Sequence, residues 1–547
     1  MIPLIKQLKG SPSWCWVVVS GILLGLNAPG RHTQILGMIS LFPLFLVLDR
    51  IHANQESTWK RKFGRILAAC WGTGSIAALI GTSWITYASQ VFGQLPWVGA
   101  VLITGLGYGF EVTLVLFICF GIPMLIIRRR GWWDIPVRLS FFLIIEPFCP
   151  RLFNWTFGGL TFAGFPWISQ IADVIGSSGL GIFSIGFSLL LVIMWRWKVE
   201  HLPIPLRAIR GMVILYLLLW CIGFLYGVSK VESLKGHLNE GAPLHVIALQ
   251  PNFSFQQLRS NAMDYFAKER SLRELLRHSI QAINESPENP SIPRLVIWPE
   301  SAYPSAYFKD VRLQPLVRDF SRRYRTSILF NSVDWDETLS GRRFYGIAVL
   351  MDSNGEVKGR YNKIFRMPFG EYIPGARIFP SYARWVRKHI ANLSEYQEGE
   401  EFTVLNVSDE LQVCAPICFD ALSPAIIRNM ARNGAKLVIN ISNLIWFGNT
   451  NASDQLEMTL RWKAIENRVP IFLLSNNGES LLIDALGTDV GKRLGLFEKG
   501  YLDHTIFLKQ HSSIYREYAR WIYAIIALLF IVLTMLGTKH GRIFHKE

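Results

Sequence analysis

Long apolar segments fill most of the first 228 residues of this chain, and one more lies near its C-terminus. The eight segments are Ser13–Leu26, Gln34–Leu48, Ile66–Ala88, Trp97–Ile127, Leu139–Phe148, Ser178–Trp195, Met212–Val228 and Trp521–Leu536. A helix that crosses a bilayer needs about 20 apolar residues, so the first, second and fifth segments are short, and the fifth has the length of half a broken helix. The pattern predicts a membrane α-helical bundle with eight spans. Although Lys6 and Lys9 precede the first segment as in a signal peptide, the spans that follow favour an uncleaved first helix.

The chain has a net charge of +16, and much of the excess of basic residues lies in short segments beside the apolar spans. Because these residues form no long basic run with interleaved aromatic residues, we expect no nucleic-acid partner. Lysine and arginine gather in every second connecting segment and in the C-terminal tail: Lys6, Lys9, Arg50, Lys60, Arg61, Lys62, Arg65, Arg128, Arg129, Arg130, Arg138, Arg196, Lys198, Arg207, Arg210, Lys539, Arg542 and Lys546. The short loops on the other side hold only Arg31 and Arg151. Because positive loops stay in the cytoplasm, both termini are expected there, and the long stretch before the last span is expected outside.

Residues 230–518 differ in character, because short apolar runs alternate there with helical patterns. The strand candidates are His245–Leu249, Leu295–Trp298, Ser327–Asn331, Gly346–Met351, Val413–Cys418, Lys436–Ile441, Ile471–Ser475 and Leu481–Asp484. The helix candidates are Met263–Asn284, Leu313–Tyr324, Ala425–Asn433 and Ser453–Asn467. This alternation indicates an α/β domain. We therefore expect a seven-span region (1–229), an extracytoplasmic α/β domain (230–518), and a last membrane helix with a cytoplasmic tail (519–547).

Cys418 is the candidate nucleophile of this domain. An apolar run ends at this cysteine, and a helix start follows, so backbone N–H groups and a positive helix end should favour its thiolate. The alternative is a buried structural cysteine, which is the usual state of a cysteine after an apolar run. Of the seven cysteines, Cys414 and Cys418 are close in sequence, but no second pair or nearby histidine completes a zinc pattern.

Glu300 and Lys363 supply what such a thiol needs. Glu300 follows a strand and Pro299, and strands that end at Glu300 and Cys418 would bring both groups to one sheet edge. Glu300 would act as the general base, while Lys363 would lower the thiol pKa and stabilise an oxyanion. Glu371 could hold that lysine or act as a second carboxylate. Taken singly, Glu300 and Lys363 would more often be a loop carboxylate and a surface lysine, and Glu371 a turn residue.

Four motifs, taken in order, resemble those of the nitrilase superfamily. They are Trp298-Pro-Glu300, Asn362-Lys-x-x-x-x-Pro-Phe-Gly-Glu-Tyr-x-Pro374, Cys418-Phe-Asp420 and Ser442-Asn-Leu-Ile-Trp-Phe-Gly448. Together with eight spans and a domain before the last one, they are similar to the apolipoprotein N-acyltransferase branch of that superfamily. The resemblance implies a four-layer αββα sandwich, a Glu300–Lys363–Cys418 triad with Glu371 in support, and a location in the bacterial inner membrane. It also implies ping-pong transfer of a fatty acyl chain from a phospholipid, through a thioester, to the N-terminal diacylglyceryl-cysteine of an apolipoprotein. No metal or organic cofactor is expected, because thiol, carboxylate and ammonium groups suffice.

The sequence departs from the family at two of these motifs. Phe419 and Asp420 stand where the family usually has tyrosine and glutamate, so a supporting role for Asp420 depends on the reach of the shorter acid. Leu444 and Ile445 replace the usual aspartate and alanine. We expect six side chains to face substrate or lipid: Trp298, Trp385, Leu444, Ile445, Trp446 and Phe447. The stretch Ile378–Ile390 mixes aromatic and basic residues and predicts an interfacial lid, or else an ordinary amphipathic helix packed on the domain.

Two other functions fit parts of the sequence. A membrane-anchored amidase or nitrilase would use the same triad with water as the second acceptor. A non-catalytic lipid-handling protein or transporter is less compatible, because no inverted repeat is visible. The spans also hold almost no acidic residues beyond Glu111 and Glu146.

Overall fold

The computed structural model describes residues 12–29, 33–54, 57–127, 130–149, 151–153, 159–162, 165–287, 289–338, 341–389 and 394–543. The chain forms two compact units. The first comprises Met1–Gln90, Leu95–Val231 and Glu517–Glu547, and the second comprises Val91–Gln94 and Glu232–Arg516. Several residues of the charge argument lie outside the described ranges, namely Lys6, Lys9, Arg31, Arg128, Arg129 and Lys546.

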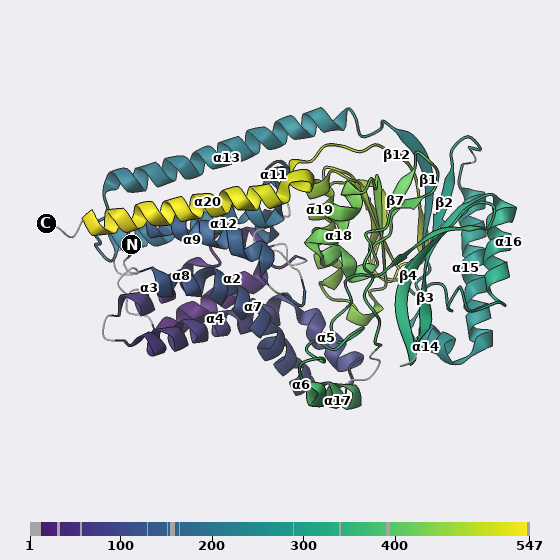
Figure 1. Cartoon of the computed structure of the whole chain (residues 1–547), viewed down its shortest axis with the longest axis horizontal. Helices are drawn as coiled ribbons and strands as arrows, with labels where there is room; N and C mark the ends of the chain where they lie inside the picture. Colours follow the sequence, from purple (N-terminus) through teal and green to yellow (C-terminus); the bar gives the residue numbers. More distant parts are fainter. Residues whose placement is uncertain are drawn as a thin grey trace. The chain divides into compact units, whose positions relative to one another are not determined.

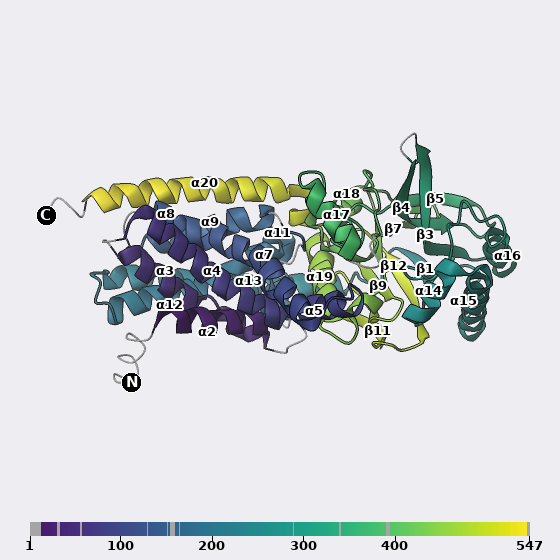
Figure 2. The ribbon, with the colours of Figure 1, turned by 90° about the horizontal axis from the view of Figure 1, so that it is seen from below.

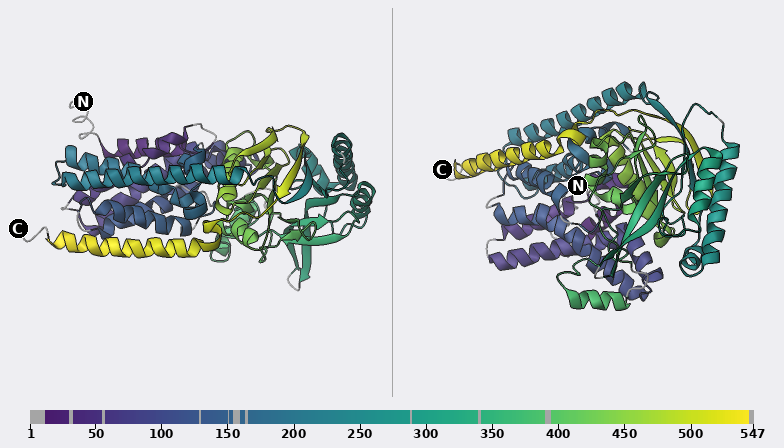
Figure 3. Two further views of the ribbon diagram at one scale, coloured as in Figure 1. Left: turned by 90° about the horizontal axis from the view of Figure 1, so that it is seen from above. Right: turned by 45° about the vertical axis from the view of Figure 1, so that its right-hand side comes forward.

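The described part of the first unit is helical (Figure 1). Its elements are α2 (Ser13–Leu26), η1 (Gln34–Met38), α3 (Phe42–Ala53), α4 (Trp59–Gly81), α5 (Ser83–Val91), α6 (Trp97–Leu102), η2 (Ile103–Tyr108), α7 (Gly109–Leu116), η3 (Phe117–Gly121), α8 (Ile122–Ile126), α9 (Asp134–Ile145), η4 (Glu146–Phe148), η5 (Leu160–Phe162), α10 (Pro166–Ser169), α11 (Ala172–Gly179), α12 (Gly181–Lys198), α13 (Leu206–Lys235) and α20 (Ile514–Ile543). The helices α13 and α20 run along the outside of this unit (Figure 3).

Five helical stretches of the described residues are long and apolar enough to cross a membrane. They are Gln34–Ala53, Trp59–Gly81, Trp97–Ile126, Gly181–Lys198 and Leu206–Lys235. The predicted first span is the 14-residue α2, and the predicted fifth span corresponds to the 12-residue α9 and the short η4. The predicted eighth segment lies within the 30-residue α20, where Trp521 and Leu528 are exposed. Several apolar helices thus indicate a membrane protein, whereas eight spans remain a prediction.

A buried ion-pair network joins α3, α9 and α12. The Arg196 guanidinium donates to Asp49 Oδ2 at 2.6 Å and to Asp134 Oδ2 at 2.8 Å. Arg138 donates to Asp49 Oδ1 at 2.8 Å. All four side chains are at most 2% exposed, so each charge depends on the others for its compensation.

Two mixed six-stranded sheets form the centre of the second unit. The first sheet has the order β12-β1-β2-β3-β4-β5, from β12 (Gly500–Leu508), β1 (Ala242–Gln250), β2 (Arg294–Ile297), β3 (Ser327–Thr338), β4 (Gly341–Met351) and β5 (Val357–Asn362). The second has the order β11-β10-β9-β8-β7-β6, from β11 (Asp489–Leu494), β10 (Ser480–Ile483), β9 (Ile471–Ser475), β8 (Leu437–Ser442), β7 (Gln412–Cys414) and β6 (Leu405–Asn406). In each sheet, three neighbouring central strands are parallel and the flanking strands are antiparallel.

Helices cover the outer faces of the two sheets, with α15 and α16 on one side and α18 and α19 on the other (Figures 1 and 2). The remaining elements of this unit are α14 (Phe255–Met263), α15 (Tyr265–Glu285), α16 (Gln314–Tyr324), α17 (Pro380–His389), η6 (Cys418–Leu422), α18 (Pro424–Arg432), η7 (Ile445–Phe447) and α19 (Ala452–Asn467). The core between the first sheet and its helices includes Leu272 and Val317 from the helices and Val296 and Val349 from the strands. The α/β prediction is therefore confirmed.

Two element boundaries differ from the sequence prediction. The helix expected over Met263–Asn284 is divided at Asp264, whose carboxylate accepts the N–H groups of Phe266 and Ala267 and so starts α15. The strand expected to reach Cys418 ends at Cys414, and an isolated bridge between Ile417 and Ile441 of β8 follows it.

Candidate active site

Cys418 occupies a strained turn between the end of β7 and α18. Its φ of 51° lies in the left-handed region, which few side chains other than glycine tolerate. Asn440, in the middle of β8, holds this turn through two hydrogen bonds: its Nδ2 donates to the carbonyl of Cys418 at 2.9 Å and to that of Pro416 at 3.1 Å. The strand pairing that brings β8 beside this segment therefore also fixes the direction of the thiol.

Glu300 lies where the chain leaves β2, three residues after the strand ends. The next residue, Ser301, has a φ of 64°, and its N–H donates to Asn331 Oδ1 at 2.9 Å. The Glu300 carboxylate accepts the backbone N–H of Asn443 at 2.9 Å, so the residue just after β8 of the second sheet orients a carboxylate that follows β2 of the first.

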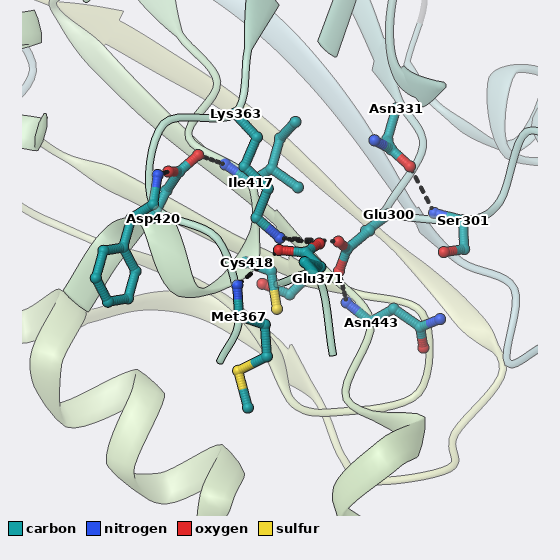
Figure 4. Close-up of polar contacts among 12 residues, drawn as sticks. Glu300, Ser301, Asn331, Lys363, Met367, Glu371, Ile417, Cys418, Asp420 and Asn443 are labelled. Carbon is teal, nitrogen blue, oxygen red and sulfur yellow. Dashed lines mark hydrogen bonds and ion pairs between the residues drawn. The ribbon is translucent and has the colours of Figure 1, made fainter. Parts of the chain in front are cut away.

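Lys363 directly follows β5 and lies between two carboxylates (Figure 4). Its Nζ is 2.7 Å from Glu371 Oε1 and 3.5 Å from Glu300 Oε1. Glu371 also accepts the N–H of Met367 at 2.7 Å, which fixes the loop that carries it. The structure thus brings Glu300, Lys363, Glu371 and Cys418 together in one small region of the second unit.

Burial and charge set the proton affinities of the two groups nearest the thiol. Burial raises the pKa of Glu300; the Lys363 ammonium opposes this rise and the Glu371 carboxylate adds to it. Burial would lower the pKa of Lys363, but Glu371 and Glu300 outweigh it and raise that pKa well above the ordinary lysine value. Lys363 is therefore a permanent cation, while Glu300 is a carboxylate that takes up a proton more readily than an exposed glutamate.

The resting thiol differs from the sequence expectation. Burial and the charge of Glu300 raise the pKa of Cys418 well above its usual value, although Lys363 and the Asn443 N–H lower it. This contradicts the expected thiolate: the prediction rested on a helix end and did not include the burial of Cys418, a residue that is 6% exposed and lies beside a carboxylate. A protonated thiol would need a base before it could attack, and the Glu300 carboxylate interacts with this thiol.

Asp420 reaches four donors despite being shorter than glutamate. Its oxygens accept the N–H groups of Ile417, Ile364 and Phe365 at 2.9, 3.2 and 2.6 Å, and the Tyr361 hydroxyl at 2.8 Å. Burial raises its pKa to about 6, although Lys363 and these donors lower it. Asp420 therefore ties the turn of Cys418 to the segment just after Lys363.

Phe419 is buried and packs its ring against Phe447, with centroids 5.4 Å apart. These two rings link the turn of Cys418 to η7.

Four of the six side chains expected to face lipid are buried. Trp298 is 0% exposed, and its indole N–H donates to Ser279 of α15, because side-chain alternation along β2 directs it away from the other sheet. Leu444, Ile445 and Phe447 are buried in and beside η7. Their apolar character serves packing at these positions, which corrects the expectation of a lipid-facing loop.

The other two expected side chains remain accessible. Trp446 is partly buried, with its ring 5.6 Å from that of Phe255, and Trp385 of α17 is 56% exposed.

Three residues that hold the site were missed by sequence reasoning: Asn331, Asn440 and Tyr361. Asn331 and Asn440 are polar residues inside apolar strand segments, and this interruption is the one signal that could have indicated them. Nothing in the sequence near Tyr361 indicates its contact with Asp420, because 59 residues separate the two. In the described part of the chain, no group of three or more His, Cys, Asp or Glu residues has the arrangement of a metal site.

Two mixed sheets with a cysteine, a lysine and two glutamates beside their strand ends fit the resemblance to the nitrilase superfamily. In agreement, the carbon-nitrogen hydrolase family matches residues 257–516, and the apolipoprotein N-acyltransferase N-terminal domain matches residues 20–190. Two family models thus match successive parts of the chain, and relatives named apolipoprotein N-acyltransferase match over most of it, as the resemblance of its motifs predicted.

Relatives of the same family name match over almost the whole chain. The apolipoprotein N-acyltransferase of Geobacter metallireducens is 27% identical over 521 residues, covering 92% of this chain and 90% of that protein. The apolipoprotein N-acyltransferase 2 of Leptospira interrogans is 25% identical, covering 86% and 88%. The apolipoprotein N-acyltransferase of Borreliella burgdorferi is 23% identical, covering 95% of each. Among solved structures, Saccharomyces cerevisiae Nit3, a member of branch 10 of the nitrilase superfamily, is similar at 15% identity with a TM-score of 0.35, covering 51% of this chain and 94% of that chain.

Proposed function

We propose that this protein is an N-acyltransferase that moves a fatty acyl chain from a phospholipid to the α-amine of the N-terminal diacylglyceryl-cysteine of an apolipoprotein. The observation that carries the proposal is the grouping of Cys418, Glu300 and Lys363 in a chain that also has the N-terminal domain of apolipoprotein N-acyltransferases. The names of full-length relatives support the same activity.

In the first half-reaction, Cys418 Sγ attacks the ester carbonyl of the phospholipid while Glu300 takes the thiol proton. The charge on the carbonyl oxygen is stabilised by the Lys363 ammonium, which the two neighbouring carboxylates keep protonated. The carbon–oxygen bond then breaks, Glu300 returns its proton to the departing oxygen, and a lysophospholipid leaves. The acyl chain remains on Cys418 as a thioester.

In the second half-reaction, the neutral α-amine of the apolipoprotein attacks the thioester carbonyl. A carbon–nitrogen bond forms, the carbon–sulfur bond breaks, and Glu300 takes a proton from the amine and passes it to the departing thiolate. The products are an N-acylated lipoprotein and the original thiol. The transfer is thus split into two steps: the Cys418 thiol attacks the ester carbonyl in the first, and the amine attacks the thioester carbonyl in the second.

Glu371, Phe419 and Asp420 are proposed to support this chemistry without touching substrate. Glu371 holds the Lys363 ammonium at 2.7 Å, and Asp420 ties the turn of Cys418 to the segment after Lys363. Phe419 packs its ring against Phe447 of η7 and so supports the turn. Trp446 and Trp385 are the remaining candidates for contact with lipid.

The proposed setting is the bacterial inner membrane, with the catalytic domain outside the cytoplasm and both termini inside. The distribution of lysine and arginine over alternate connecting segments supports this orientation. Eight spans are proposed, and the apolar helices of the first unit support a multi-pass protein.

The test combines the purified full chain, phospholipid and a synthetic diacylglyceryl-cysteinyl peptide. We expect the peptide to gain the mass of one acyl chain at its amine, and the matching lysophospholipid to appear in equal amount. Cys418→Ala should abolish both products. Release of ammonia from small amides without acyl gain on the peptide would instead identify an amidase, and a folded protein that does neither would contradict the proposal.

A further inference from the structure

The segment between Glu371 and Tyr396 begins and ends at the candidate active site, and we call it the excursion. The N–H of Tyr396 donates to the carbonyl of Glu371 at 2.9 Å, and the N–H of Ser394 donates to that of Gly370 at 2.8 Å. The chain between these contacts carries α17, while residues 390–393, including Ile390 of the predicted lid, lie outside the described residues. Because Glu371 holds Lys363, the two ends of the excursion lie at the ion pairs of the site.

Small side chains anchor α17 to the domain. Ala383 and Val386 are buried against Ile373, with Ala376 packed beside them. Apart from Ala383 and Val386, the residues of α17 are exposed.

The outward surface of this excursion is rich in large apolar side chains. Ile378 is 74% exposed and Phe379 is 62% exposed, just before the helix begins. Tyr382 and Trp385 are exposed on the helix itself. Four such side chains within eight residues form a patch that water solvates poorly, and aromatic residues of this kind are favoured at the boundary between headgroups and acyl chains.

The charge of the same surface has one sign. Arg377, Arg384, Arg387 and Lys388 lie between Gly375 and His389, and this stretch contains no acidic residue. Arg387 donates to Glu395 at 2.5 Å, and Arg384 donates to the hydroxyl of Ser381 at 2.9 Å. The apolar patch is thus bordered by cationic groups with only one acidic side chain in contact among the described residues.

We propose that α17 docks on a lipid bilayer that carries anionic headgroups, with Phe379 and Trp385 in the interface and Arg384 and Lys388 at the phosphates. A mixed aromatic and basic face binds such a surface through apolar burial and through electrostatic attraction together. Each basic residue near an anionic bilayer strengthens binding by about fivefold. The inference deepens the proposed function, since docking would bring the Lys363–Glu371 loop to the source of the acyl donor.

Hydrogen–deuterium exchange on the full chain tests this docking. The protein is placed in nanodiscs of phosphatidylcholine alone, or of phosphatidylcholine and phosphatidylglycerol in equal parts. We expect the amides of residues 375–389 to exchange more slowly in the anionic nanodiscs, and added salt to reduce the difference because it screens the attraction.

A matched pair of variants separates docking from folding. The double substitution Arg384→Gln with Lys388→Gln should reduce the gain in protection by up to about 25-fold. The double substitution Arg270→Gln with Arg277→Gln removes two exposed charges from α15 of the same unit and should leave the gain unchanged. Acyl labelling of Cys418 in the wild type, measured on the same nanodiscs, reports the enzyme separately, so a failed docking experiment is distinguishable from a failed enzyme.

Three results would overturn the inference. The first is equal exchange of residues 375–389 in neutral and anionic nanodiscs. The second is a gain in protection that both double variants keep. The third is protection that depends on protein concentration rather than on lipid charge, which would identify a second copy of the chain as the occupant of this face.

Discussion

Asn440 controls the position of the candidate nucleophile, although it touches no substrate in the proposed reaction. Its side chain donates to the carbonyls on both sides of the turn that sets φ at Cys418 to 51°. Asn440→Ala leaves both carbonyls without that donor, at a cost of about 1–3 kcal/mol in stability. We expect kcat for acylation to fall by about 100-fold, because a displaced nucleophile misses its reactive geometry, with KM for the phospholipid unchanged.

The matched control is Asn406→Ala, the same substitution on an exposed position of β6 in the same sheet. It should leave kcat and the unfolding temperature at their wild-type values. Wild-type kcat in Asn440→Ala would show that the turn holds Cys418 without this residue.

In the proposed reaction, the raised pKa of Glu300 gives the acylation rate a defined pH dependence. Glu300 must be ionised to accept the thiol proton, so the rate falls as the pH drops through its pKa, which lies above the value of about 4.3 for an exposed glutamate. In Glu300→Gln the rate should drop by about 10²–10⁴-fold. The remaining rate should rise steadily with pH, because only thiolate that forms unaided can react and the pKa of Cys418 is high.

The check is the pH profile of acyl-label uptake for the wild type, Glu300→Gln and Glu401→Gln, whose carboxylate is exposed in the same unit. Glu401→Gln should follow the wild-type profile. A profile of Glu300→Gln that is parallel to the wild type would exclude Glu300 as the base.

At the scale of elements, the Asp49–Arg138–Arg196–Asp134 network locks three helices of the first unit. Arg196→Leu leaves Asp49 and Asp134 buried with less compensation, and breaking such a pair costs about 3–5 kcal/mol. We expect a marked drop in the unfolding temperature of the full chain in detergent.

Arg130→Leu is the control for this prediction. Its ion pair with Glu200 is partly exposed, at 17% and 18%, and should contribute at most about 1 kcal/mol. Equal unfolding temperatures for Arg196→Leu and Arg130→Leu would contradict a structural role for the network.

The sequence predicted the strands that are buried and continuous, and missed those that depend on distant partners. β1, β3, β8 and β9 are apolar runs that local pattern identifies. β12 contains Asp503 and His504, and it becomes a strand through antiparallel pairing with β1, more than 240 residues earlier in the chain. Such pairing leaves no local periodicity.

The residues of the candidate site likewise divide into those that the local sequence indicates and those that depend on distant partners. Motif order indicated Glu300, Lys363, Glu371 and Cys418, and the structure brings these four together. The side-chain contacts of Asn440 and Asp420 could not be predicted, because each arises from a loop geometry that only the assembled sheets define. The direction of the pKa of Cys418 was predicted wrongly for the same reason, since burial is a property of the fold.

For the whole molecule, the charge pattern makes a prediction about orientation that reporter fusions can test. Alkaline phosphatase fused after His201, between α12 and α13, should be inactive, because that loop is expected in the cytoplasm. The same enzyme fused after Glu240, beyond α13, should be active outside. The opposite pair of activities would contradict the proposed orientation and place the catalytic domain in the cytoplasm.

The most direct test of the proposed acyltransferase is to look for the acyl chain on Cys418. The purified protein is incubated with a phospholipid that carries a tagged acyl chain, and protein-bound label is then treated with hydroxylamine, which cleaves thioesters. Cys414→Ala, which removes a buried thiol four residues away, serves as the matched control. We predict hydroxylamine-labile label on the wild type and on Cys414→Ala, and none on Cys418→Ala. Label that persists on Cys418→Ala, or no label on a folded wild type, would contradict the thioester and with it the proposed transfer.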